Sequence, residues 1–204
     1  MFQTLFWDMG GTMFDTYPQV DATLAQVVRS HGHVIEELEV SRLTRVATRV
    51  AITELSRRFG IPAAKFTAAE ADLKRRWRTN PPPAMAGLRE VMAAASGKNL
   101  VVTHRDRTSA MALLNSHDIE VDDLICPGAG FPRKPDPAMH LELIARHRLD
   151  PKHCLGIGDR PLDAQAARAA GIAAATLITP ELDLPTAPAQ FTAHNLTDLL
   201  PLVE

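Results

Sequence analysis

Hydrophobic residues follow two alternating patterns along much of this 204-residue chain. Short apolar runs, which are typical of buried strands, occur at residues 3–7, 99–103, 123–126, 153–157 and 172–178. Hydrophobic residues with helical spacing follow or precede these runs and predict helices over 84–95, 108–117, 138–148 and 162–170. Strands that alternate with helices favour an α/β fold, a parallel sheet with helices on both faces. Near the end of the chain, prolines predict a loop over 179–189, and an apolar stretch predicts a closing helix over 196–203.

Residues 17–81 do not share this alternation, because their hydrophobic pattern is helical throughout. The spacing predicts three helices, over about 20–31, 36–59 and 63–78. Three consecutive prolines, Pro81 to Pro83, cannot continue a helix and indicate a stiff connector. We therefore predict a discontinuous core over 1–16 and 82–204, with a small all-α domain over 17–81 inserted after the first strand.

Composition narrows the function classes. The chain is 46% hydrophobic and 23% charged, which is typical of a soluble globular protein. Its net charge of −2 gives no field that favours nucleic acid or a membrane surface, and no apolar run reaches the ~20 residues of a membrane span. No signal-peptide pattern precedes the first strand. We interpret Cys126 and Cys154 as buried free thiols and expect a cytoplasmic protein without nucleic-acid or membrane partners.

The first candidate site follows the first strand, at Asp8-Met9-Gly10-Gly11-Thr12. Gly10 and Gly11 let the backbone turn sharply and leave room for a ligand against the main chain. Asp8 would then lie at the carboxyl edge of the sheet, where open α/β folds bind ligands. Taken alone, the stretch fits a strand end with an Asx-type turn equally well.

Three further polar clusters follow later strands. Thr103 ends the second strand, and its hydroxyl, together with the amides of the next helix, could bind an anion. Lys134 lies between prolines, which can aim its ammonium group at a fixed point. Asp159 and Asp163 follow the fourth strand and add two carboxylates at the same edge as Asp8. Carboxylates that cluster in this way repel each other unless a cation neutralises them, and Mg²⁺ suits oxygen ligands and a substrate phosphate.

Together these segments resemble the four motifs of the haloacid dehalogenase superfamily, and the insertion resembles its helical-cap subfamily, which includes phosphoglycolate phosphatase-like enzymes. The resemblance covers essentially the whole chain. It implies a Rossmann-like core, a mobile cap, and hydrolysis of a small phosphorylated metabolite, of which a phosphoglycolate-like monoester is one example, through an aspartyl-phosphate. Asp8 would be the nucleophile, and Thr103 and Lys134 would bind the phosphoryl group.

The resemblance also implies Mg²⁺, held by Asp8, Asp159 and the backbone carbonyl of Gly10. Asp163 would be a further ligand or would support the site. Gly10, Gly11 and His104 lie on the loops that would surround the phosphate, and they are candidate phosphate-binding residues. The sequence leaves open whether the protein is a monomer or a homodimer.

Gly10 departs from the family pattern, because phosphatases of this family have a second Asp there. That carboxylate is the general acid for the leaving group and the base for the attacking water, and such catalysis is worth ~10²–10⁴-fold. We therefore expect a slow phosphatase that prefers good leaving groups. His104 is a candidate for the missing acid–base group.

Two alternatives follow from the same departure. The protein could bind a phosphorylated ligand without turning it over. It could also be a dehalogenase or phosphonatase, since these relatives also lack the second Asp. A dehalogenase needs no Mg²⁺, which Asp159 argues against, and a phosphonatase would need Lys65 or Lys74 as a Schiff-base lysine.

Overall fold

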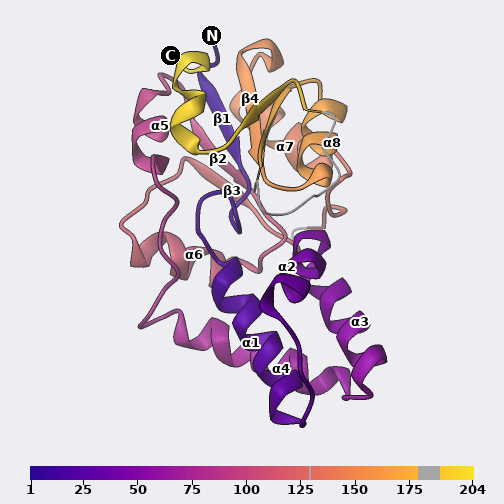
Figure 1. Ribbon diagram of the computed structural model, residues 1–204. Coiled ribbons are helices and arrows are strands. Elements are labelled where there is room, and N and C mark those ends of the chain that lie inside the picture. Colours follow the sequence, from indigo (N-terminus) through magenta and orange to yellow (C-terminus); the bar gives the residue numbers. More distant parts are fainter. Residues whose placement is uncertain (129, 179–188) are drawn as a thin grey trace. The chain divides into compact units, whose positions relative to one another are not determined.

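The computed structural model describes residues 1–128, 130–178 and 189–204. The described residues form one parallel sheet with the strand order β3-β2-β1-β4-β5-β6 (Figure 1). The strands are β1 (Thr4–Trp7), β2 (Asn99–Val102), β3 (Asp123–Ile125), β4 (Cys154–Gly158), β5 (Ala173–Leu177) and β6 (Phe191–Ala193). Because β1 lies between β2 and β4, the loops that follow these three strands meet at one edge of the sheet.

Helices cover both faces of this sheet, as predicted. They are α5 (Leu88–Ala94), α6 (Arg107–Ser116), α7 (Ala138–His147) and α8 (Pro161–Ala169), with 3₁₀ helices η1 (Pro151–His153) and η2 (Leu196–Leu202). Figure 1 shows α7 and α8 on one side of the sheet, and α5 and α6 on the other. The fold is therefore α/β and Rossmann-like.

Residues alternate between the two faces of the central strands. Phe6 and Leu100 point toward α7 and α8, where they join a buried cluster with Met139 and Ala167. Burial of each such large side chain contributes about 1.5–3 kcal/mol. Trp7 is also fully buried, and its Nε1 donates a hydrogen bond to Asn99 Oδ1 over 2.9 Å. The end of β1, and Asp8 with it, is thereby held in the core.

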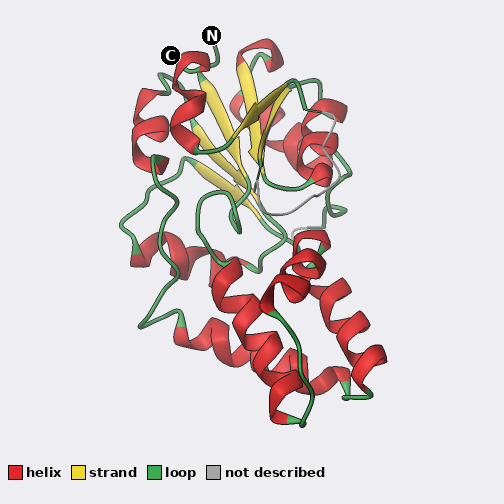
Figure 2. Ribbon diagram, in the orientation of Figure 1, coloured by secondary structure: helices red, strands yellow, loops and turns green. Residues whose placement is uncertain are grey.

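The chain divides into two compact units, Met1–Phe14 with Ala84–Glu204, and Asp15–Pro83. The second unit contains only helices (Figure 2): α1 (Tyr17–Ser30), α2 (Glu37–Val46), α3 (Thr48–Phe59) and α4 (Ala63–Arg76). The sequence predicted this inserted unit over 17–81, and the unit in the structure is Asp15–Pro83. Trp77 is buried in this unit, and its Nε1 donates to Gln19 Oε1 over 2.5 Å.

A buried carboxylate joins the first two helices of this unit. Asp21 on α1 accepts hydrogen bonds from Ser41 Oγ (2.5 Å) and Thr44 Oγ1 (2.6 Å) on α2. Arg45 lies 3.6 Å from Asp21 Oδ2, and its guanidinium stacks 3.4 Å from the centre of the Tyr17 ring. Burial raises the pKa of Asp21 in spite of these partners. The contacts fix α2 against α1.

The single helix predicted over 36–59 is wrong, because Ala47 is extended (φ −173°) and separates α2 from α3. The helical spacing of apolar residues continues across this break, so the sequence pattern does not reveal where one helix ends and the next begins. Val46 and Thr48 are β-branched and favour the helix only weakly. The contacts of Ser41 and Thr44 with α1 then outweigh the preference for one long helix.

The predicted helix over 84–95 begins later, at Leu88, since Gly87 has a φ of +80° that no helix contains. The closing segment over 196–203 is a 3₁₀ helix, which Pro201 keeps from becoming a regular α-helix. The short strand β6 was not predicted. The predicted loop over 179–189 lies, apart from Ala189, outside the described residues.

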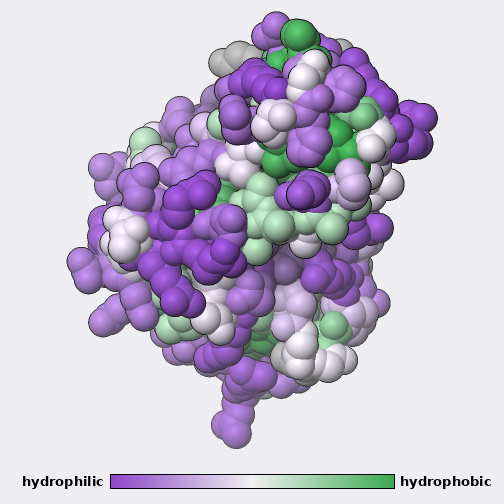
Figure 3. Space-filling model, turned by 90° about the horizontal axis from the view of Figure 1, so that it is seen from below, coloured by the Kyte–Doolittle hydropathy of each residue, from purple (hydrophilic) through white to green (hydrophobic). Residues whose placement is uncertain are grey.

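The remaining sequence predictions concern the surface and the thiols. Cys126 and Cys154 are both buried and free, as expected. No helix within the described ranges is long and apolar enough to cross a membrane. The face in Figure 3 carries mostly hydrophilic side chains, with hydrophobic ones between them.

One buried histidine makes the stability of the core depend on pH. His140 on α7 stacks on Phe6 with 5.6 Å between ring centres, and its Nδ1 is buried without a hydrogen-bond partner. Burial, with a smaller effect of the Lys134 charge, lowers the pKa of His140 to about 3. As the pH falls below about 6.5, the unfolded chain gains a proton at this residue that the folded chain does not.

We therefore expect wild-type protein to lose stability between pH 8 and pH 5, and His140→Phe to lose up to about 2 kcal/mol less. Urea unfolding at both pH values measures the free energy of unfolding. The difference between wild type and variant at pH 8 gives the effect of altered packing, which is then subtracted from the difference at pH 5. His153→Gln, at an exposed position, is the matched control. Equal losses in wild type and His140→Phe would contradict the assignment.

Candidate active site

The loop after β1 holds Asp8 in a fixed position. The Asp8 backbone N–H donates to the Ile157 carbonyl of β4 over 2.9 Å, and the Met9 carbonyl accepts from Phe14 N over the same distance. Gly11 has a φ of +82°, which a side chain would strain. The Asp8 carboxylate is nearly completely buried, and its Oδ2 accepts no hydrogen bond. A buried carboxylate oxygen without a partner is costly unless a cation or substrate uses it.

Lys134 is the nearest cation to this carboxylate in the described structure. Its Nζ lies 2.6 Å from Asp8 Oδ1, donates to the Val102 carbonyl over 2.9 Å, and forms an ion pair with Asp163. Burial alone would lower the pKa of Lys134, but the carboxylates of Asp163 and Asp8 outweigh it and raise the pKa. The ammonium group therefore stays charged although its side chain is only 1% exposed.

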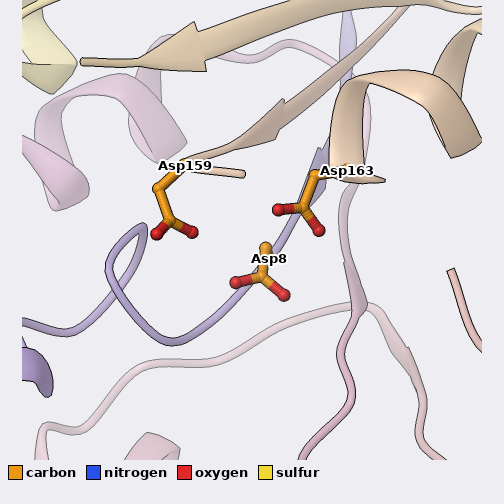
Figure 4. A group of neighbouring side chains, drawn as sticks. All are labelled: Asp8, Asp159 and Asp163. Atoms are coloured by element: carbon orange, nitrogen blue, oxygen red, sulfur yellow. The ribbon is translucent and has the colours of Figure 1, made fainter. Parts of the chain in front are cut away.

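Asp159 and Asp163 bring two more carboxylates to Asp8. Figure 4 shows the three side chains gathered from the ends of β1 and β4 and from the start of α8. One oxygen from each lies within 4.8 Å of the others. A Cβ at Gly158 would overlap the Asp163 side chain, so only glycine permits this approach.

These carboxylates are suited to a divalent metal. Three carboxylates provide the hard oxygen ligands that Mg²⁺ prefers, and Asp8 Oδ2 has no other partner. The oxygens of Asp163 are already engaged, Oδ1 with Lys134 and Oδ2 with the backbone N–H of Arg160 over 3.1 Å. Asp8 Oδ2 is thus the carboxylate oxygen of this cluster that is best placed to hold a metal.

A second cation lies beside the same carboxylates. The Arg160 guanidinium lies within 4.0 Å of Asp8, Asp159 and Asp163. Arg160 received no role from the sequence, because a single arginine after a carboxylate has no distinctive spacing. Three formal negative charges and two positive ones leave the cluster with a net charge of −1.

Thr103 and His104 follow β2 on the neighbouring loop. Thr103 is buried, and its Oγ1 accepts a hydrogen bond from Arg105 N over 3.1 Å. Asp106 caps α6 by accepting from Ser109 N over 2.9 Å. The Ser109 amide, one of those in the first turn of α6 that could bind an anion, is thus already engaged.

His104 is half-buried, and its Nε2 has no hydrogen-bond partner. Burial, followed by the charges of Lys134 and Arg160, lowers the pKa of His104 to about 4. The imidazole is therefore neutral near pH 7 and lacks the proton that a general acid delivers. This disfavours His104 as the replacement for the missing carboxylate.

The structure thus brings Asp8, Lys134, Asp159 and Asp163 together. Gly10 and Gly11 lie in the turn after Asp8, where Gly10 forms a bridge with Phe14. Thr12, which received no role from the sequence, is fully buried, and its Oγ1 donates to Asp159 Oδ1 over 3.4 Å. The roles predicted for these residues remain predictions.

A sequence profile of haloacid dehalogenase-like hydrolases matches residues 2–171. The chain belongs to this family. No curated protein matches the sequence. The family is one of hydrolases, and the buried Asp8 carboxylate and the Lys134 cation both lie within the matched residues.

Solved structures share the fold over nearly the full chain. A haloacid dehalogenase-like protein of unknown function from Agrobacterium tumefaciens is 15% identical (TM-score 0.82; 99% of this chain, 97% of that one). A predicted phosphoglycolate phosphatase from Haemophilus somnus is 17% identical (0.78; 98% and 97%). CbbY from Rhodobacter sphaeroides, in complex with phosphate, is 16% identical (0.72; 98% and 96%).

The role of Lys134 as the cation shared by the buried carboxylates can be tested by measuring the stability of the folded protein. Lys134→Met leaves the buried carboxylates of Asp8 and Asp163 without their shared cation, which costs about 3–5 kcal/mol. The two carboxylates then repel each other, and a proton that binds to one of them relieves this repulsion, so the folded variant recovers stability as the pH falls.

Urea unfolding in EDTA at pH 8 and pH 5 measures both effects. We expect Lys134→Met to be less destabilised, relative to wild type, at pH 5 than at pH 8. Lys152→Met removes an exposed lysine and is the control. A destabilisation that does not change with pH would show that lost packing, not charge, causes it.

Proposed function

We propose that this protein is a Mg²⁺-dependent hydrolase that releases phosphate from a small phosphorylated metabolite. The observation that carries the proposal is the buried Asp8 carboxylate, which pairs with Lys134 through Oδ1 and has no partner at Oδ2. The phosphate complex of CbbY supports a phosphorylated substrate. A phosphoglycolate-like monoester is one candidate.

In this reaction the Asp8 carboxylate attacks phosphorus, and the bond to the leaving oxygen breaks, so that an aspartyl-phosphate and an alkoxide form. The alkoxide takes a proton from water and leaves as the alcohol. Water then attacks the phosphorus and releases inorganic phosphate and Asp8. Asp8 needs no base for the first step, since an aspartate is ionised near neutral pH. Lys134 orients Asp8 and offsets negative charge on the transferring group.

A divalent cation would be held by Asp8 and Asp159, with the Gly10 carbonyl and Asp163 as the remaining candidates. When bound, it would neutralise negative charge on the phosphoryl oxygens. Thr103 is the candidate hydroxyl contact to the same oxygens. In this proposal the helical unit over Asp15–Pro83 acts as the cap.

The candidate residues of this site provide no clear donor of a proton to the leaving group. Gly10 carries no side chain, and His104 is neutral near pH 7 with a pKa of about 4. Substrates whose leaving groups depart without protonation therefore suit the site best. We propose that turnover is slow on alkyl phosphates for this reason.

One alternative, a protein that binds a phosphorylated ligand without hydrolysis, rests on Gly10. A phosphonatase is less well supported, because Lys65 is exposed and Lys74 pairs with Glu70 over 2.7 Å. Neither lysine has the buried, unpaired environment that activates an amine.

Asp8→Asn should abolish phosphate release from p-nitrophenyl phosphate and acetyl phosphate, since the amide is not a nucleophile. Phosphate release with Mg²⁺, compared with EDTA, measures the activity. Asp122→Asn, outside the site, is the control. Full activity in Asp8→Asn would exclude the aspartyl-phosphate, and no release by wild type over hours, despite tight ligand binding, would favour the binding protein.

Gly10→Asp should raise turnover of an alkyl phosphate by about 10-fold or more, because it restores a carboxylic acid beside the leaving group. Turnover of p-nitrophenyl phosphate should rise less, since p-nitrophenolate leaves without a proton. Comparing kcat for the two substrates separates acid catalysis from a general change in the site. An equal rise for both, or none, would show that the missing carboxylate does not limit the reaction.

A further inference from the structure

Arg160 is the one charged side chain in the carboxylate cluster that the proposed reaction leaves without a role. Its side chain is only 15% exposed. Nη2 lies 4.0 Å from Asp8 Oδ1, and Nε lies 4.0 Å from Asp159 Oδ1 and 3.8 Å from Asp163 Oδ2. These separations exceed those of hydrogen bonds, so the three contacts are electrostatic.

The same three carboxylates are the candidate metal ligands. A guanidinium group and a divalent cation would therefore compete for one cluster of negative charge. When a divalent cation takes these oxygens, its charge and that of Lys134 together cancel the three negative charges, so the net attraction that holds the guanidinium is lost. The largely buried guanidinium then loses the compensating charge of these three carboxylates, which is unfavourable unless another anion approaches it.

The phosphoryl group of the substrate is the anion that such a site receives. An arginine presents a planar set of N–H donors that matches phosphate oxygens, and Arg160 already lies 4.0 Å from the carboxylate that would attack phosphorus. Lys134, in contrast, is held by Asp8, Asp163 and the Val102 carbonyl.

We propose that Arg160 changes partners when ligands bind. Its guanidinium balances Asp8, Asp159 and Asp163 in the metal-free protein, and it binds the phosphoryl group of the substrate once a divalent cation occupies those carboxylates. The proposal rests on the function proposed above. It makes Arg160 a phosphoryl-binding residue and a competitor of the metal.

A purely structural role at the start of α8 makes a different prediction. The hydrogen bond between Arg160 and Asp163, in the first turn of the helix, uses the Arg160 backbone N–H, which donates to Asp163 Oδ2 over 3.1 Å, while the side-chain Nε lies 3.8 Å from the same oxygen. Substitution of the side chain keeps this bond. A side chain that only supports the loop would, when removed, weaken the binding of metal and phosphate alike.

The test measures both ligands on Arg160→Gln by calorimetry. Metal-free protein is titrated with Mn²⁺, and protein saturated with Mg²⁺ is titrated with inorganic phosphate. We expect Mn²⁺ to bind about threefold or more tightly, since a competing positive charge is gone. We expect phosphate to bind about tenfold or more weakly, because charge-assisted hydrogen bonds are lost.

Two control variants sharpen the result. Arg168→Gln removes one positive charge from an exposed position on the same helix, about 12 Å along its axis, and should change neither affinity. Arg160→Lys keeps the charge but loses the planar donors, so Mn²⁺ affinity should stay near the wild-type value while phosphate affinity falls. Circular dichroism and thermal unfolding show that each variant is folded.

Opposite changes in the two affinities of Arg160→Gln support the proposal, and any other combination overturns it. If the wild-type protein binds both ligands and Arg160→Gln binds them with the same affinities, the proposal for Arg160 is overturned but the proposed function is not. A wild-type protein that binds neither Mn²⁺ nor phosphate overturns the proposed function as well.

Discussion

A single buried ammonium group sets the requirements for the core of this protein. Lys134 has lost its water, and it stays charged because Asp8, Asp163 and the Val102 carbonyl surround it. Removing any one partner leaves the others in a medium of low polarity, where an unpaired charge is costly. The ends of β1 and β2 and the start of α8 must therefore meet at one point. The order of the sheet, with β1 between β2 and β4, is what allows this.

The α/β core could be predicted because its buried parallel strands are continuous apolar runs, and because chemically distinctive residues such as Asp8 and Lys134 follow strands or sit between prolines. The break at Ala47 could not, since it depends on contacts between helices and not on local spacing. Strand β6 is short and only partly buried. Arg160 received no role from the sequence because Asp159 and Asp163 are its near neighbours in the chain, and only the fold brings Asp8 beside them.

The cluster combines features that suit the proposed hydrolysis with one feature that does not. Its charges are balanced to within one unit, its metal candidates are oxygens, and its cations lie beside the carboxylate proposed to attack. Gly10, however, offers no group that can carry a proton, and His104 is kept neutral by burial and by its cationic neighbours. The site therefore keeps the groups for electrostatic stabilisation but lacks those for acid–base catalysis. The contribution of each to the reaction rate can be measured separately in this protein.

The chain carries two tryptophans, and each is buried in a different unit. Trp7 precedes Asp8 in the sheet, and Trp77 packs within the helical unit, where it contacts Gln19. Exposure to water changes the emission of a buried indole, so fluorescence of single-tryptophan variants follows each unit separately. Each unit thus contains its own fluorescent probe. Denaturation followed separately at Trp7 and at Trp77 shows whether the two units unfold together or one after the other.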